Sequence, residues 1–327
     1  MNPVDPTLYM EEPRVLLERA ARQMEKAVLG KSGVISRMML ALLAGGHVLL
    51  EDVPGVGKTL LARSFARAFD LSHSRVQMTP DLMPADITGC AVYHPKRGEF
   101  EFRHGPLQAN LVLADELNRT PPRTQAALLE AMEEGQVTAD GQTFRLPSPF
   151  MVIATQNPLE HEGTYRLPEA QLDRFMLKLS LGYPNRTAEV TMLGSDREAP
   201  PEQRIKPQLS CEELAALKRL VGRVHVDDQL KLYAVDLANA TRQHPDVRLG
   251  VSPRATLALY KAVQAYAYMQ GRNYAIPDDV KALVPDIWRH RLVLNPEAAY
   301  RSGRAGAVLE EVLNKVPVPA YSRAAGH

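Results

Sequence analysis

Short apolar runs alternate with longer amphipathic stretches over the first part of the chain. Three runs, Val48–Leu50, Leu111–Ala114 and Phe150–Thr155, have the length and composition of buried parallel strands. Shorter strands are predicted at 75–78 and 176–181, and helical spacing of apolar residues predicts helices at 14–28, 33–44, 60–69 and 124–134. Strands that alternate with helices predict an α/β fold in which helices sandwich a parallel sheet.

Other stretches break this alternation. Residues 91–103 show hairpin-like alternation, and residues 136–144 read as two short strands around an Asp-Gly turn. From about Pro200 only helices are predicted, at 228–243, 252–269 and 277–291, after a capping-box start at Ser210. The proline-containing stretch 184–207 is the expected linker. We therefore expect an α/β domain at 1–195 and a smaller all-α domain at 196–327.

The first apolar strand leads directly into a glycine-containing loop and a helix. Strand, glycine loop and helix are the context of a phosphate-binding loop, in which backbone N–H groups and the helix N-terminus meet phosphates. Lys58 is expected to neutralise the outer phosphates and Thr59 to ligate magnesium. The loop departs from the pattern G-x-x-x-x-G-K-[ST] because Asp52 stands at the first glycine position. The residues expected to bind nucleotide are Pro54, Gly55, Val56, Gly57, Lys58, Thr59 and Leu60.

Polar residues stand where the next two apolar strands end. Because ligands of parallel sheets bind beyond the carboxyl ends of the strands, we expect Asp52, Asp115 and Asn157 to meet in one crevice. In phosphoryl transfer, Asp115 would hold magnesium, and Glu116 would accept a proton from the attacking water. Asn157 would position that water. An ordinary strand end and a turn-forming Asn before Pro158 are the plainer alternatives.

Two arginines are candidates for contact with phosphate. Arg174 offers planar donors for a γ-phosphate, and its alternative role is an ion pair with Asp173 or Glu169. Arg254 follows a Ser-Pro helix start, where a cation opposes the helix dipole. That unfavourable placement hints that Arg254 serves another anion, and a solvated surface arginine is the alternative.

Three further features carry no expected chemistry. Gly30-Lys31-Ser32 looks like a second phosphate loop, but no strand precedes it, so a helix end followed by a new cap explains it better. His161-Glu162 lacks the second histidine of a zinc motif. Cys90 and Cys211 are far apart without ligand spacing, which suggests two inert thiols in a reducing compartment.

Length and charge limit the class of protein. The chain has 327 residues and a formal net charge of +1 at pH 7, which argues against a strong electrostatic grip on nucleic acid. Its start is polar and proline-rich, and its longest apolar stretch, 38–50, is too short for a bilayer span of about 20 residues. We expect a cytoplasmic protein with no membrane span.

Three long blocks carry a family likeness. They run from Ala44 to Thr59, from Leu113 through Arg119 with 125–134, and from Ile153 to Phe175. With these blocks the chain resembles the MoxR family of AAA+ ATPases over nearly its whole length. The resemblance implies a phosphate-loop AAA+ core followed by a helical lid, and Mg²⁺-dependent ATP hydrolysis.

The resemblance also implies roles for individual residues and for the assembly. Lys58 and Thr59 match the Walker A pair, Asp115 and Glu116 match Walker B, Asn157 looks like sensor 1, Arg174 like the arginine finger and Arg254 like sensor 2. The stretches 91–103 and 136–146 resemble the helix-2 insert and the pre-sensor hairpin of this clade. Such proteins are similar to chaperone-like remodellers that form hexameric rings and act on protein clients, often with a von Willebrand A domain partner. A DNA- or RNA-translocating motor and a metal-chelatase motor subunit, from the same clade, are the alternatives.

Overall fold

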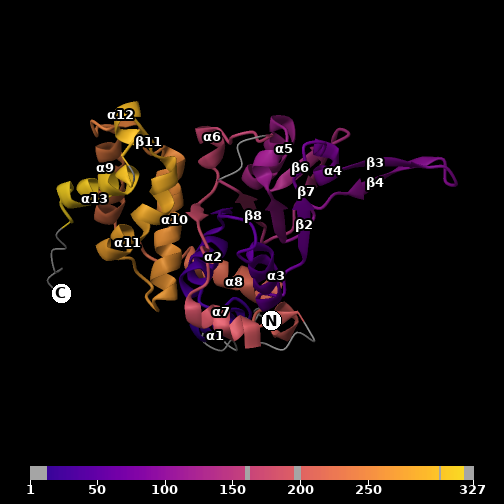
Figure 1. The fold of residues 1–327 in the computed structure, drawn as a ribbon, viewed down its shortest axis with the longest axis horizontal. Coiled ribbons are helices and arrows are strands. Elements are labelled where there is room, and N and C mark those ends of the chain that lie inside the picture. Colours follow the sequence, from indigo (N-terminus) through magenta and orange to yellow (C-terminus); the bar gives the residue numbers. More distant parts are fainter. Residues whose placement is uncertain (1–12, 159–162, 195–199, 302, 320–327) are drawn as a thin grey trace, which may run out of the picture. The chain divides into compact units, whose positions relative to one another are not determined.

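The computed structural model describes residues 13–158, 163–194, 200–301 and 303–319. These residues divide into two compact units, of which the first ends at Arg219 and the second begins at Leu220 (Figure 1). Each unit has a buried apolar core of its own. Among the described residues, no helix combines the length and the apolar character that a membrane crossing requires.

A five-stranded parallel sheet lies at the centre of the first unit. Its spatial order is β2-β5-β8-β1-β9, with bounds His73–Gln77, Leu111–Asp115, Met151–Gln156, Val48–Glu51 and Leu177–Leu179. The five residues from Met151 to Thr155 of β8 are buried, as expected for a strand whose two faces are both covered. The strand β8 lies between β5 and β1, so the carboxyl ends of these three strands are neighbours.

Helices pack against this sheet, as the alternating pattern predicted. Helix α2 (Ser32–Ala44) contacts β9, α3 (Lys58–Ala68) contacts β5, and side chains of α5 (Pro122–Glu134) share the apolar core with the sheet. The other helices of this part of the chain are α1 (Pro13–Ala27), α4 (Pro84–Thr88), α6 (Glu169–Leu172), α7 (Arg186–Gly194) and α8 (Cys211–Val221), with 3-10 turns η2 (Leu117–Arg119) and η3 (Pro201–Arg204). Helix α2 ends at Gly45, which has φ of 71°, and the N–H of Gly46 donates to the carbonyl of Ala41. The predicted capping box is present: the Ser210 N–H donates to Glu213, and the Glu213 N–H donates to the Ser210 hydroxyl.

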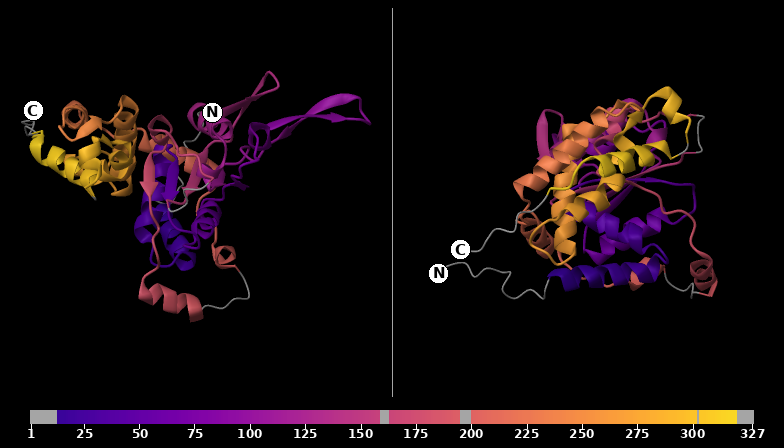
Figure 2. Two further views of the ribbon diagram at one scale, coloured as in Figure 1. Left: turned by 45° about the horizontal axis from the view of Figure 1, so that its top comes forward. Right: turned by 90° about the vertical axis from the view of Figure 1, so that its left-hand side faces the viewer.

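Two hairpins extend from the sheet. They are β3 (Gly89–His94) with β4 (Glu99–His104), and β6 (Gln136–Ala139) with β7 (Gln142–Arg145). The first projects as a long two-stranded arm (Figure 1, Figure 2). Phe102 of β4 stacks on Phe144 of β7 with ring centroids 4.0 Å apart, and this contact joins the two hairpins near their bases.

The second unit is helical with one small addition. It contains α9 (Asp228–Arg242), α10 (Pro253–Met269), α11 (Pro277–Trp288), η4 (Arg289–Arg291), α12 (Pro296–Ala299) and α13 (Arg304–Lys315). The indole N–H of Trp288, a fully buried side chain, donates to the carbonyl of Ala255 and so joins α11 to α10. The strands β10 (Val247–Leu249) and β11 (Val293–Leu294) pair antiparallel. A pattern of helices alone did not predict them, because strands of two or three residues have no readable periodicity.

The segment expected to link the domains is partly structured. It contains α7 and η3, and the first compact unit continues to Arg219, beyond the expected boundary at residue 195. Contacts with α3 explain this extension. Arg67 donates to the carbonyl of Ile205, and the Gln208 N–H donates to the carbonyl of Ala68. The end of the expected linker therefore packs along α3 and belongs to the first unit.

A buried histidine joins three elements next to β1. The His47 ring accepts a hydrogen bond from the Val152 N–H at its Nδ1, and its Nε2 lies 3.0 Å from the carbonyl of Met132. The proton of the neutral ring therefore belongs on Nε2, where it is donated to Met132. Burial lowers the pKa of His47 from 6.5 to about 4. The ring therefore stays neutral at physiological pH.

Acid should weaken the fold through His47. Above pH 6.5 the ring is neutral in both the folded and the unfolded chain, whereas between pH 6.5 and about 4 only the unfolded chain takes up the proton. The free energy of unfolding should fall by roughly 3 kcal/mol over that window. Denaturant unfolding at a series of pH values measures it. His47→Gln should lack this component while the exposed-site control His73→Gln keeps it; equal slopes in both variants would contradict the assignment.

Candidate active site

The loop after β1 has the backbone of a phosphate-binding loop. Gly55 and Gly57 have φ of 83° and 94°, values that residues with a Cβ rarely adopt. Gly57 is the N-cap of α3, and no side chain among the described residues caps this helix, so its first N–H groups remain available to an anion. A Cβ on either glycine would meet no atom of the described part of the chain within 4 Å, so the loop borders open space there. The backbone and its surroundings therefore fit a phosphate group.

The contacts of Asp52 explain how the loop accommodates a carboxylate in place of the first glycine. Its carboxylate turns away from the loop and accepts hydrogen bonds from the Ser180 hydroxyl at 2.9 Å, the Gly182 N–H at 3.1 Å and the Leu181 N–H. Its carbonyl oxygen accepts from Lys58 Nζ at 2.9 Å. Asp52 thus fixes the segment that follows β9 through its side chain and accepts a hydrogen bond from Lys58 through its carbonyl.

The second glycine-lysine motif binds the same segment after β9. Lys31 Nζ donates to the carbonyls of Gly182 at 3.1 Å and of Tyr183 at 2.8 Å. The structural interpretation of Gly30-Lys31-Ser32 is therefore confirmed, since Ser32 begins α2. The motif at His161-Glu162 lies outside the described residues. Among the described residues, no group of three or more His, Cys, Asp or Glu side chains could hold a metal ion by itself.

Thr155 positions the two carboxylates at the carboxyl end of β5, those of Asp115 and Glu116. Its hydroxyl donates to Asp115 Oδ1 at 2.6 Å and accepts from the Glu116 N–H at 2.9 Å. The opposite oxygen of Asp115 accepts from Arg75 Nη2 at 2.7 Å and Nε at 3.2 Å. Sequence reasoning missed both Thr155 and Arg75. The only available signal was their position on strands next to the strand that carries Asp115.

The backbone of Glu116 sets the direction of its side chain. Its φ of 61° places it in the left-handed region, which is uncommon for a residue with a Cβ and marks functional turns in many proteins. The carboxylate accepts from Gln77 Nε2 at 2.7 Å and lies 3.4 Å from Arg119 Nε. Adjacent residues therefore present two carboxylates in different directions, which allows them different roles.

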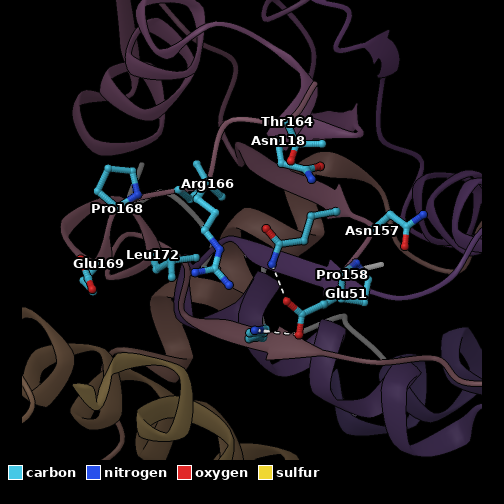
Figure 3. Close-up of a pocket in the computed structure, with 12 residues that line it drawn as sticks. Glu51, Asn118, Asn157, Pro158, Thr164, Arg166, Pro168, Glu169 and Leu172 are labelled. Atoms are coloured by element: carbon cyan, nitrogen blue, oxygen red, sulfur yellow. Dashed lines mark hydrogen bonds and ion pairs between the residues drawn. The ribbon is translucent and has the colours of Figure 1, made fainter. Parts of the chain in front are cut away.

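Asn157 lines a cavity of about 490 Å³ at the carboxyl ends of β1, β8 and β9 (Figure 3). In its wall, Glu51 accepts from Gln156 at 2.5 Å and pairs with Lys178 at 2.7 Å. Of the three residues expected to share a crevice, only Asn157 lines this cavity. Asp52 instead turns toward the chain after β9, and Asp115 turns toward β2.

The two candidate arginines lie in different units. Arg174 follows α6, donates to the carbonyl of Leu129 at 2.7 Å and pairs with Glu133 at 3.0 Å, so its ion-pair partner is on α5 rather than Asp173 or Glu169. Arg254 lies in the first turn of α10, in the second unit. There the Ser252 hydroxyl accepts from the Ala255 N–H at 3.0 Å, which confirms the predicted cap.

Comparison with known families places this site in a defined class. Residues 47–177 match the model of the ATPase family associated with various cellular activities (AAA), and residues 239–312 match the model of the AAA lid domain. Together with the sheet order and the loop, these matches make the protein an AAA ATPase whose core is followed by a helical lid.

Relatives narrow the class to one family. The chain is 43% identical to the chaperone MoxR1 of Mycobacterium tuberculosis, over 93% of this chain and 82% of that protein. It is 49% identical to the uncharacterized protein YeaC of Bacillus subtilis, over 95% and 97% of the two chains. A crystal structure of a candidate ATPase from Cytophaga hutchinsonii superposes with a TM-score of 0.88 at 36% identity, over 94% and 96% of the two chains. The chain belongs to the MoxR family of chaperone-like AAA ATPases.

Removal of the Thr155 hydroxyl should disable the site. In Thr155→Val the Asp115 oxygen and the Glu116 N–H lose their shared partner, so ATP turnover should fall by roughly 10- to 100-fold. The free energy of unfolding should fall by about 1–3 kcal/mol. Steady-state hydrolysis and denaturant unfolding measure the two effects, and Thr155→Ser should resemble the unaltered protein.

Thr241→Val is the matched control for this variant. Thr241 is also fully buried, donates to the carbonyl of Ala238 at 2.7 Å and accepts from the Val251 N–H at 3.2 Å, but it lies in the second unit. It should lose stability with little loss of turnover. Equal turnover losses in the two valine variants would mean that Thr155 acts through general stability alone.

Proposed function

We propose that this chain hydrolyses ATP in a Mg²⁺-dependent reaction and uses the energy to remodel or mature protein complexes. One observation carries the site assignment. A single hydroxyl, that of Thr155, holds Asp115 and the backbone of Glu116 at the end of β5. The strand that supplies it, β8, pairs with both β5 and β1, and β1 leads into the phosphate loop. One strand, β8, therefore separates the strand that carries the carboxylates from the strand that leads into the loop.

The residues of the proposed site have different chemical roles. The N–H groups at the start of α3 and the Lys58 ammonium bind the phosphates. Thr59 and Asp115 are the groups that would hold a divalent metal, which when bound neutralises charge on the phosphate oxygens. Glu116 accepts the proton of the attacking water, and the Asn157 amide orients that water.

We infer that the complete site is shared between subunits of a homo-hexamer. Arg174 is bound to α5 by Leu129 and Glu133, and none of its hydrogen bonds goes to the phosphate loop of its own chain in the described residues. A role for Arg174 at a neighbouring subunit's γ-phosphate is consistent with that placement. Arg254, near the start of the lid helix α10, would be a further cation of the site, in the role of sensor 2.

A protein client fits the family better than the alternatives do. MoxR1 bears the name of a chaperone, and a net charge of +1 gives no electrostatic support for tracking along nucleic acid. We propose a protein client, a partner with a von Willebrand A domain and a cytoplasmic site of action. ATP-dependent capture of clients and partners on a hydrolysis-deficient ring would test this assignment.

Glu116→Gln should bind ATP without turning it over. The amide keeps the shape of the side chain but accepts no proton, so the rate should fall by at least about 100-fold while nucleotide affinity stays within a few-fold. Phosphate release and equilibrium nucleotide binding measure the two quantities. Glu310→Gln, the same change on an exposed face of α13, should leave both unaltered. Normal turnover by Glu116→Gln would remove Glu116 from the role of base.

Mixed rings should show whether Arg174 acts on a neighbour. Arg174→Ala and Glu116→Gln should each be inactive alone. If Arg174 acts in trans, a mixture of the two places an intact Glu116 beside an intact Arg174 at some interfaces, so activity should partly return. Hydrolysis measured against mixing ratio reports this recovery. A mixture as inactive as its components would rule out the shared site.

A further inference from the structure

The carboxylate assigned to the metal already has a cation beside it. Arg75 lies on β2, the edge strand next to β5, and both its Nη2 and its Nε donate to Oδ2 of Asp115, at 2.7 and 3.2 Å. The Thr155 hydroxyl occupies the other oxygen at 2.6 Å. About three of the four acceptor positions of the Asp115 carboxylate are therefore filled from within the chain.

This arrangement conflicts with metal binding at the same carboxylate. A divalent cation near Asp115 needs the negative charge that Arg75 neutralises, and like charges a few ångströms apart repel one another. We infer that Arg75 and the metal compete for Asp115, so that Arg75 sets the metal concentration that the nucleotide site requires. This inference rests on the proposed function, because it takes Asp115 as the metal-holding carboxylate.

The side chain of Arg75 is placed so that it can leave. It is 46% exposed, whereas that of Asp115 is 12% exposed, so the arginine is much more accessible to solvent than the carboxylate. Its Nη2 also donates to Gln77 Oε1 at 3.1 Å, on the same face of β2. A guanidinium displaced from Asp115 therefore keeps one partner and gains water. Water can solvate the exposed guanidinium once it is released, and the metal can take over the charge of the carboxylate, so release is feasible when nucleotide and metal enter.

Direct metal titration tests the competition. Mn²⁺ binding is measured by electron paramagnetic resonance on the full chain with a saturating non-hydrolysable ATP analogue. Arg75→Met removes the charge and keeps the length of the side chain, so Mn²⁺ should bind about 3- to 10-fold more tightly. Arg75→Lys keeps the charge and should lie near the unaltered protein. Arg75→Gln replaces Arg75→Met if the latter does not fold.

Arg14→Met is the matched control. Arg14 is 51% exposed and pairs with Glu18 of the same helix, α1, at 3.3 Å, so its loss should leave Mn²⁺ affinity unchanged. Equal or weaker Mn²⁺ binding by Arg75→Met than by the unaltered protein would overturn the competition. Failure of the unaltered protein to bind the analogue would instead overturn the proposed function, so the two outcomes are distinguishable.

Discussion

The Thr155 hydroxyl is the contact on which the geometry of the site depends. It ties the end of β8 to the end of β5 through one bond to a carboxylate and one to a backbone N–H. Because the bond to Asp115 is buried and the bond to the Glu116 N–H is partly buried, displacement of either residue would leave polar groups unpaired, which is costly away from water. The left-handed backbone of Glu116 follows from the same constraint, since Glu116 must turn away from Asp115 while its N–H stays on Thr155. Two adjacent carboxylates can in this way serve different steps.

Three cations of the proposed site have partners within the chain. Lys58 rests on a carbonyl, Arg75 rests on Asp115, and Arg174 rests on α5. Burial of an unpaired charge is expensive, so a site that must carry several charges needs such internal partners before its ligand arrives. Ligand binding is then an exchange of partners rather than the filling of a bare charge. The free energy needed to release these internal partners therefore contributes to the affinity of the site, together with the contacts to the ligand.

The elements of the core were largely predictable. The strands around Leu50, Ala114 and Ile153 are short runs of apolar residues, too short for a typical buried helix. The glycine loop directly follows one of them. The helical lid was predictable for the same reason of periodicity. The boundary between the units was not, because the segment after β9 packs along α3 through contacts such as that of Arg67 with Ile205, and such contacts leave no pattern in the sequence.

The sequence by itself determined the fold class and the positions of the glycine loop and of the strand that ends in two carboxylates, because apolar periodicity and the backbone demands of glycine act over a few neighbouring positions. Only the tertiary structure decided which way those residues turn. It turned Asp52 away from the loop, aimed Asp115 at Arg75 and placed Glu116 against Gln77. These partners stand 39 to 130 positions apart in the chain, and it is the order of the strands in the sheet that makes them neighbours.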